Sequence, residues 1–273
     1  MKNHPSMGAA RLATDQTTVL KHFQEMVPLS GCAVLEVGGR LDAEVVKATG
    51  ASDWWSVDPR NPPLRPEGVL QTICGVASEI PLPDESADHV FSSNAFQHIH
   101  DLPESLAELS RVLRPGGYLY ANFGPIWSGP DGSHIEDLVI DQQRYDFWSH
   151  ALLPSWSHLV FDEDELLVLL SAVHRRAVAV AICAYVFHSS WINRLSYREY
   201  QRILEQSPLA LVSLGGSSEV DYDYCPPQIN HPLAKRLESD RLPRELQQRG
   251  GLDWIDAQIR DVELILRKSE SVT

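Results

Sequence analysis

Two carboxylates and a glycine pair between residues 32 and 58 form the first pattern that could do chemistry. Glu36 lies inside a short apolar run, and Gly38 and Gly39 end that run. Asp58 follows a second apolar run, about 20 residues beyond the glycine turn. Glycine lets the backbone approach a ligand closely, and a carboxylate in this place accepts hydrogen bonds from ribose hydroxyls. The pattern predicts a nucleoside site; the alternative is a buried pair of strands that binds no ligand.

These side chains need a strand–turn–helix–strand unit to position them, and the sequence predicts one. The helical spacing of apolar residues over 41–49 separates two short strands. The expected strands lie at residues 32–37, 54–57, 69–74, 88–93, 118–123, 175–187 and 261–267. Most of them alternate with helices or long loops, which favours parallel pairing with right-handed crossovers. We therefore expect a doubly wound, mostly parallel, seven-stranded α/β sheet whose ligand lies at the carboxyl ends of the strands.

Five segments narrow the choice of nucleoside. The turn lacks the G-x-G-x-x-G pattern of dinucleotide sites, which disfavours an NAD(P)-linked oxidoreductase. The segments are VLEVG at 34–38, Asp58, ASEIPLPDESAD at 77–88, SSNAFQHI at 92–99 and LRPGG at 113–117. In this order and spacing they resemble the class I S-adenosylmethionine-dependent methyltransferases, of the small-molecule, type 11-like kind. The resemblance implies a Rossmann-like sheet with helical cap insertions and S-adenosylmethionine as the cofactor, with S-adenosylhomocysteine as its product.

The resemblance also implies roles for residues at the strand ends. Glu36 is expected to orient the turn and to receive the methionine amino group, directly or through water. Gly38 and Gly39 are expected to give backbone access to the methionine part, and Asp58 to accept both ribose hydroxyls. Asn94 is expected to face the methionine part and the reacting sulfonium.

Other positions are expected around the adenine, and two of them depart from the family pattern. Pro59 or Arg60 should border the ring, and Val76 and Ala77 should lie along its edge. The family often has an acid where Val76 stands, so the adenine amino group would need a backbone or neighbouring partner here. Arg40 stands in place of a glycine, where it could crowd the cofactor or pair with its carboxylate.

Two histidines are candidates for the proton transfer that methylation of a hydroxyl requires. A hydroxyl acceptor needs a base, whereas a neutral amine needs only desolvation and alignment. His134 lies in the loop that leaves the fifth strand, and histidine titrates near neutral pH, so it is the first candidate. The alternative is a loop histidine that fixes the backbone. His98 is the second candidate, although the family motif often has histidine there, which favours structural support.

Residues 124–158 are also rich in possible metal ligands and aromatic side chains. The possible metal ligands are His134, Glu136, Asp137, Asp141, His150 and His158. Their spacing matches no tight coordination pattern, so we expect no metal. The aromatic residues are Trp127, Tyr145, Phe147, Trp148, Trp156 and, further on, Trp191. Most should form the core of a cap, while the proposed substrate-binding residues are Trp127, His134, Tyr145 and Trp148.

Composition restricts the class of protein and its partners. The 273 residues carry a net charge of −14, which disfavours a nucleic-acid partner and an anionic membrane surface. The longest apolar run, residues 177–187, is shorter than the roughly 20 residues that span a bilayer. The four cysteines lie far apart, which favours buried thiols in a reducing compartment over disulfides or a zinc site. No signal-peptide pattern opens the sequence. We expect a cytoplasmic protein, and the aromatic-rich cap could support a homodimer.

The pattern divides the chain into six parts. We expect an N-terminal segment with a helix, a cofactor-binding core, a first cap insertion with the substrate loop, a core helix and strand, a second cap insertion and a final helix and strand of the core. Their boundaries are 1–28, 29–123, 124–160, 161–188, 189–250 and 251–273. Within the second insertion, residues 209–232 are expected to be irregular.

The sequence therefore predicts an enzyme that transfers a methyl group from S-adenosylmethionine to a small molecule. A hydroxyl acceptor is favoured, by in-line displacement with a histidine as base. N- or C-methylation, methylation of a peptide or protein, and a non-catalytic cofactor-binding or scaffold subunit are the alternatives.

Overall fold

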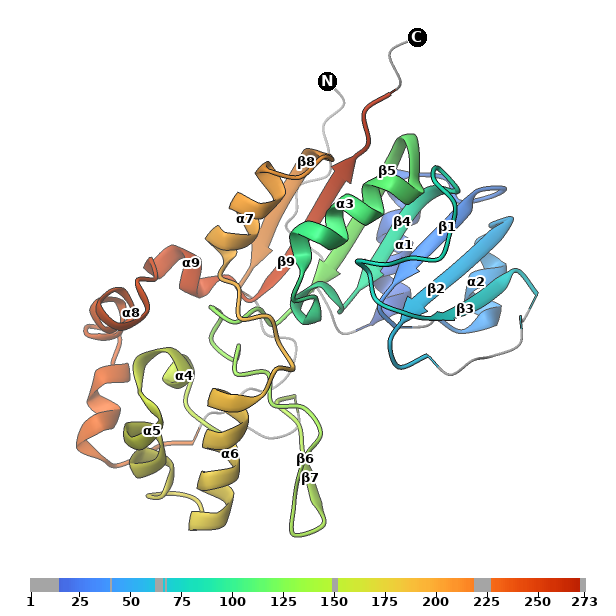
Figure 1. Cartoon of the computed structure of the whole chain (residues 1–273). Helices are drawn as coiled ribbons and strands as arrows, with labels where there is room; N and C mark the ends of the chain where they lie inside the picture. The colour runs from blue at the N-terminus through green and yellow to red at the C-terminus, as the bar shows by residue number, and fades with distance from the viewer. Residues whose placement is uncertain are drawn as a thin grey trace. The chain divides into compact units, whose positions relative to one another are not determined.

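The computed structural model describes residues 15–39, 41–61, 66, 68–148, 152–218 and 227–270 (Figure 1). The chain forms two compact units. The first comprises the described residues of Met1–Gly124, Glu199–Gly216 and Asp261–Thr273. The second comprises those of Pro125–Arg198 and Ser217–Arg260.

A seven-stranded sheet forms the centre of the first unit. Its strands lie in the order β3-β2-β1-β4-β5-β9-β8. Their bounds are β1 Ala33–Val37, β2 Asp53–Asp58, β3 Leu70–Cys74, β4 Ala87–Ser93, β5 Leu113–Phe123, β8 Ala210–Ser217 and β9 Asp261–Arg267. The pairs β1/β2, β1/β4, β2/β3 and β4/β5 are parallel, and β5/β9 is antiparallel. The expected fold class is confirmed, and the order reverses at β1/β4, where open α/β sheets bind ligands.

Helices cover both faces of this sheet (Figure 1). On one face lie α1 (Gln16–Met26) and α2 (Ala43–Ala48), and on the other lie α3 (Leu102–Val112) and α7 (Tyr197–Glu205). Phe23 of α1 stacks on Phe91 and Tyr120, with ring centroids 5.8 and 5.4 Å away. The central strands β1 and β4 are largely buried because helices cover both faces of the sheet.

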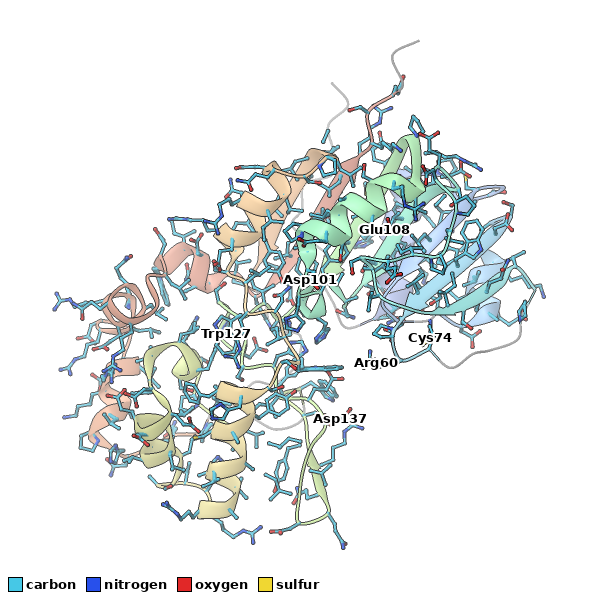
Figure 2. All side chains as sticks on the ribbon, in the orientation of Figure 1. Arg60, Cys74, Asp101, Glu108, Trp127 and Asp137 are labelled. Carbon is cyan, nitrogen blue, oxygen red and sulfur yellow. The ribbon has the colours of Figure 1, made fainter. Side chains whose placement is uncertain are left out.

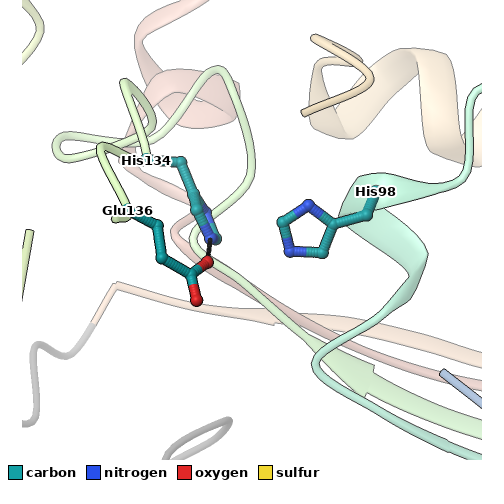
Figure 3. Close-up of side chains that lie close together, drawn as sticks. All are labelled: His98, His134 and Glu136. Carbon is teal, nitrogen blue, oxygen red and sulfur yellow. Dashed lines mark ion pairs between the residues drawn. The ribbon is translucent and has the colours of Figure 1, made fainter. Parts of the chain in front are cut away.

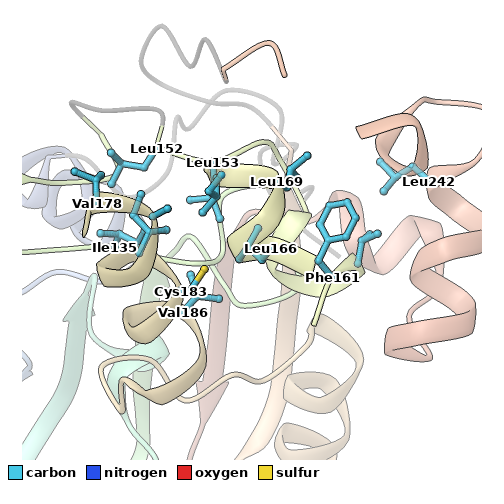
Figure 4. Packing of buried hydrophobic residues seen from close by; sticks show 14 of the residues in the cluster. Ile135, Leu152, Leu153, Phe161, Leu166, Leu169, Val178, Cys183, Val186 and Leu242 are labelled. Atoms are coloured by element: carbon cyan, nitrogen blue, oxygen red, sulfur yellow. The ribbon is translucent and has the colours of Figure 1, made fainter. Parts of the chain in front are cut away.

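Helices and a small hairpin build the second unit around its own apolar cluster (Figure 4). Its elements are β6 Leu138–Ile140, β7 Gln143–Tyr145, α4 Ser157–Val160, α5 Glu163–Leu170, α6 Arg176–His188, α8 Leu242–Gly250 and α9 Trp254–Gln258. A capping box of Asp162 and Glu165 begins α5. Arg236 and Arg249 both pair with Glu165, at 3.0 and 2.7 Å, which ties α5 to the segment around α8.

The strand expected at residues 175–187 is wrong, because this segment is the helix α6. Alternating Val178, Val180 and Ile182 resemble a strand, yet the buried residues recur with the helical period. They are Val178, Ala179, Ile182, Cys183 and Val186. The intervening alanines favour a helix, and α6 packs in the second unit rather than in the sheet.

The seventh strand comes from a segment for which no regular structure was expected. Residues 210–217 form β8 at the end of the sheet. The expectation that residues 209–232 are irregular is therefore wrong for 210–217, and so is the assignment of these residues to a cap insertion. The first three residues of β8 are exposed, and two glycines follow. An edge strand with little buried surface shows no alternating apolar pattern, so periodicity did not find it.

None of the helices in the described part of the chain is long and apolar enough to cross a membrane.

Candidate functional site

The carboxylate of Asp58 is fixed at the carboxyl end of β2 by backbone amides. One of its oxygens accepts a hydrogen bond from Gly39 N at 2.9 Å, and the other accepts one from Arg60 N at 2.6 Å. The Asp58 side chain is 8% exposed, and the largely exposed side chain of Arg60, labelled in Figure 2, places its Nε 3.4 Å from the same oxygen that accepts Arg60 N. The oxygen bonded to Gly39 N retains a second lone-pair direction for a ribose hydroxyl, and a second hydroxyl would replace the Arg60 side chain at the other oxygen.

The glycine turn joins β1 to the same strand end. Gly38 donates its N–H to Val57 O at 2.8 Å, and Ser56 Oγ donates to Gly39 O. Both glycines have positive φ, +75° and +87°. A Cβ at Gly38 would overlap the Cβ of Ala95, so the backbone after β4 lies directly against the turn. Only glycine permits both the torsion angle and this approach.

Glu36 is almost completely buried at the base of the turn. Its Oε1 accepts Leu41 N at 3.0 Å, and its Oε2 accepts the indole N–H of Trp54 at 2.8 Å. The carboxylate therefore joins the segment before α2 to β2. Its contact with a methionine amino group stays a prediction.

Asn94 lies where β4 ends, in the left-handed region with φ +56°. Its backbone N–H donates to Asn122 O at 2.8 Å, and its side-chain Oδ1 is buried without a hydrogen-bond partner in the described residues. An acceptor oxygen of this kind suits an ammonium or another donor. Together with Asp58 and the glycine turn, it makes this edge fit S-adenosylmethionine, which carries a diol and an ammonium group.

Residues expected around the adenine lie at the ends of β2 and β3. Val76 is 48% exposed beyond β3, Ala77 is nearly buried and Pro59 is exposed. An exposed apolar side chain of this kind suits the face or edge of a purine. Arg40 lies outside the described residues, so both of its suggested roles stay predictions.

His134 lies in the second unit and is 3% exposed (Figure 3). Its Nδ1 is 3.1 Å from Pro125 O, and its Nε2 is 3.7 Å from Glu136 Oε2. A carbonyl oxygen only accepts, so Nδ1 carries the hydrogen and the neutral ring has its lone pair on Nε2. The backbone φ of +46° shows a constrained turn at this residue.

The surroundings of His134 form a hydrogen-bonded group within the same unit. Tyr185 Oη donates to His134 O at 3.3 Å and accepts Glu136 N at 3.1 Å. Trp191 Nε1 donates to the carboxylate of Glu136 at 2.9 Å. Burial raises the pKa of Tyr185 to about 12, so its hydroxyl stays a donor at neutral pH. His98, drawn in Figure 3, belongs to the first unit, where it is half-buried in the 3₁₀ turn Phe96–His98.

The aromatic residues expected to bind substrate differ in environment. Trp127 and Tyr145 pack against the apolar cluster of the second unit, which agrees with the alternative that they are core residues. The ring of Trp127 lies 4.8 Å from that of His158, and the Arg194 guanidinium lies 4.9 Å from its centroid. Trp148 is 41% exposed. Their roles toward substrate stay predictions.

Sequence reasoning missed the polar residues that occupy buried strand positions. Three hydrogen bonds support the glycine turn. Ser92 Oγ donates to Val37 O at 2.8 Å, Ser56 Oγ donates to Gly39 O, and the Trp54 indole N–H donates to Glu36. Ser93 Oγ and Asn122 Oδ1 are buried without hydrogen-bond partners in the described part of the chain. A polar residue inside an otherwise apolar strand is the signal that could have found them.

Replacing Gly38 with alanine should destabilise the protein more than the same change at Gly31. Both glycines have φ near +75°, but a Cβ at Gly31 would meet nothing within 4 Å. The torsion angle alone costs about 1–2 kcal/mol, and the overlap with Ala95 adds to it only at position 38. Urea unfolding of both variants measures the difference. Equal losses would show that Ala95 yields freely and that the turn is not closely packed.

Comparison with known proteins connects this edge to a family. Residues 38–121 match the methyltransferase domain family Methyltransf_11. The matched segment runs from the glycine turn through β5, so it contains most of the edge described above.

Curated relatives align over short stretches. Malonyl-[acyl-carrier protein] O-methyltransferase of Methylococcus capsulatus is 47% identical over 53 residues, 19% of this chain and 19% of that protein. Dimethylglycine N-methyltransferase of Parasynechococcus marenigrum is 34% identical over 83 residues, 27% of this chain and 29% of that protein. The chain thus spans less than a third of the length of these relatives, and they methylate different kinds of atom.

Solved structures share the fold over nearly the whole chain. The S-adenosylmethionine-dependent methyltransferase of Mesorhizobium loti has a TM-score of 0.50 at 14% identity, covering 91% of this chain and 96% of that one. The resemblance to the class I methyltransferases is therefore confirmed in the matched segment and in the fold.

Proposed function

We propose that this chain, which carries the methyltransferase domain at residues 38–121, transfers a methyl group from S-adenosylmethionine to a small molecule. The observation that carries the proposal is the anchoring of Asp58 to the glycine turn through Gly39 N. This bond holds the Asp58 carboxylate beside the backbone of the glycine turn, at the point where the strand order reverses. A ligand that carries both a diol and an amino acid moiety requires these two features of the protein side by side.

When bound, S-adenosylmethionine supplies an electrophilic sulfonium methyl group. Asp58 would hold the ribose hydroxyls, Gly38 and Gly39 would leave room for the methionine part, and Asn94 Oδ1 would accept a hydrogen bond from its ammonium group. Such contacts would orient the methyl group toward an acceptor, and alignment of this kind lowers the barrier to a displacement.

We infer that the receiving atom is a hydroxyl oxygen and that His134 is the base. The fixed Nδ1–H leaves Nε2 as the proton acceptor, and Glu136 stabilises the imidazolium that forms. The match to an O-methyltransferase agrees with this choice, and the match to an N-methyltransferase keeps an amine as the second candidate.

Calorimetry of the full chain with S-adenosylmethionine and S-adenosylhomocysteine tests the proposal. We expect both to bind with micromolar dissociation constants, comparable to KM values of enzymes. A folded sample that binds neither would favour the non-catalytic scaffold.

A further inference from the structure

Three polar side chains lie together on one face of the sheet, at the ends of β4, β5 and β9. In the sheet register Ser93 lies opposite Asn122, and Asn122 lies opposite Glu263. Directly opposite residues of neighbouring strands share a face, so these side chains point to the same side. Glu36 lies opposite Phe91, two residues before Ser93, and therefore shares that face.

Ser93 and Asn122 are buried, yet each has an unsatisfied oxygen. Their exposed fractions are 3% and 1%. Ser93 Oγ and Asn122 Oδ1 have no hydrogen-bond partner among the described residues, while the Asn122 carboxamide also interacts with Tyr120 Oη. Buried polar groups are nearly always paired, because leaving them unpaired costs free energy. Two unpaired oxygens at directly opposite positions indicate a place prepared for the polar group of a ligand.

Glu263 adds a negative charge beside this pair. It is half-buried and accepts a hydrogen bond from Tyr120 Oη at 2.9 Å. No Lys or Arg of the described chain forms an ion pair with it. Burial, together with the Glu263 carboxylate, raises the pKa of Tyr120, so this hydroxyl stays a donor to Glu263. The group therefore contains a carboxylate without an ion pair, the Ser93 hydroxyl, which can both donate and accept, and the acceptor oxygen Asn122 Oδ1.

The group adjoins the edge assigned to the cofactor. Ser93 immediately precedes Asn94, and Val37, next to the glycine turn, lies opposite Ser92. Asn94 and Glu263, which flank the buried pair, are both partly exposed.

We propose that Ser93, Asn122 and Glu263 recognise the methyl acceptor, and that the recognised group donates hydrogen bonds. An amine or a hydroxyl satisfies the unpaired oxygens and approaches Glu263 favourably. A carboxylate would bring a second negative charge beside Glu263, and this repulsion excludes it as the recognised group. This inference rests on the proposed methyl transfer, and it separates this chain from an enzyme that acts on a free carboxylate.

Adjacent serines give a matched test of the unpaired state. Ser92 and Ser93 are both buried on β4, but only Ser92 Oγ has a partner. Thermal unfolding should show that Ser92→Ala lowers the Tm by about 2–4 °C, whereas Ser93→Ala and Asn122→Leu leave it unchanged or raise it. Equal losses at Ser92 and Ser93 would show that Ser93 is satisfied and would overturn the proposal.

Three probes with one carbon skeleton test the chemical class of the ligand. The full chain, saturated with S-adenosylhomocysteine, is titrated with 3-phenylpropan-1-ol, 3-phenylpropylamine and 3-phenylpropanoate at millimolar concentrations. We expect the alcohol or the amine to bind at least tenfold more tightly than the acid, and Asn122→Leu to remove this preference. Equal or tighter binding of the acid, or binding of none of them, would overturn the proposal. If S-adenosylhomocysteine itself fails to bind, the proposed function fails, while the serine comparison still decides whether the group is unpaired.

Discussion

His134→Ala is expected to lower kcat by about 10²–10⁴-fold, the range typical of losing a general base. The dissociation constant for S-adenosylmethionine should stay within a factor of two to three of the parent value. The reason is the ring geometry: Pro125 O holds the hydrogen on Nδ1, so Nε2 receives the acceptor proton and Glu136 compensates the new charge. Single-turnover rates and calorimetry measure the two quantities separately.

The pH dependence distinguishes a base from a structural residue. In the parent, kcat should fall toward acid, because a general base that already holds a proton cannot accept another. In His134→Ala this acidic limb should disappear. His188→Ala is the matched control, since His188 also faces a glutamate, Glu163 at 3.1 Å, but lies in solvent. Equal activity of parent and His134→Ala at every pH would remove His134 as the base.

Asp58→Ala should weaken the binding of S-adenosylmethionine by one to two orders of magnitude, about 1.4–3 kcal/mol. The variant loses the acceptor of the ribose hydroxyls. It also releases Gly39 N and Arg60 N from the carboxylate, so the glycine turn loses an anchor. Isothermal titration calorimetry gives the change directly.

A second aspartate of β2 provides the control for this measurement. Asp53 begins the strand, away from the carboxyl edge, and its carboxylate accepts a hydrogen bond from the neighbouring Ser52 Oγ at 3.1 Å. Asp53→Ala should leave the affinity unchanged. Unchanged affinity in Asp58→Ala as well would show that the ribose is held elsewhere.

Local sequence patterns sufficed for the centre of the fold. The runs that became β1, β2, β3 and β4 each contain a short apolar stretch, which indicated a strand without any structure. The sequence also indicated the glycine pair and Asp58, because few residue types suit a tight turn or can accept hydrogen bonds from a diol.

The same reasoning failed where long-range packing decides the structure. Residues 176–188 alternate like a strand but form a helix, because five buried residues at helical spacing face the apolar cluster of the second unit. Conversely, β8 has no pattern of its own and exists because the end of the sheet offers unpaired backbone groups.

The amino-acid sequence by itself thus determined the doubly wound sheet, its glycine turn and the position of the Asp58 carboxylate at the end of β2. Tertiary structure alone decided the seventh strand, which ring nitrogen of His134 carries the hydrogen, and the position of Ser93 opposite Asn122 in the sheet. The physical reason is distance along the chain. Periodicity reports neighbours within a few residues, whereas these three features depend on partners in separate segments that meet only after folding.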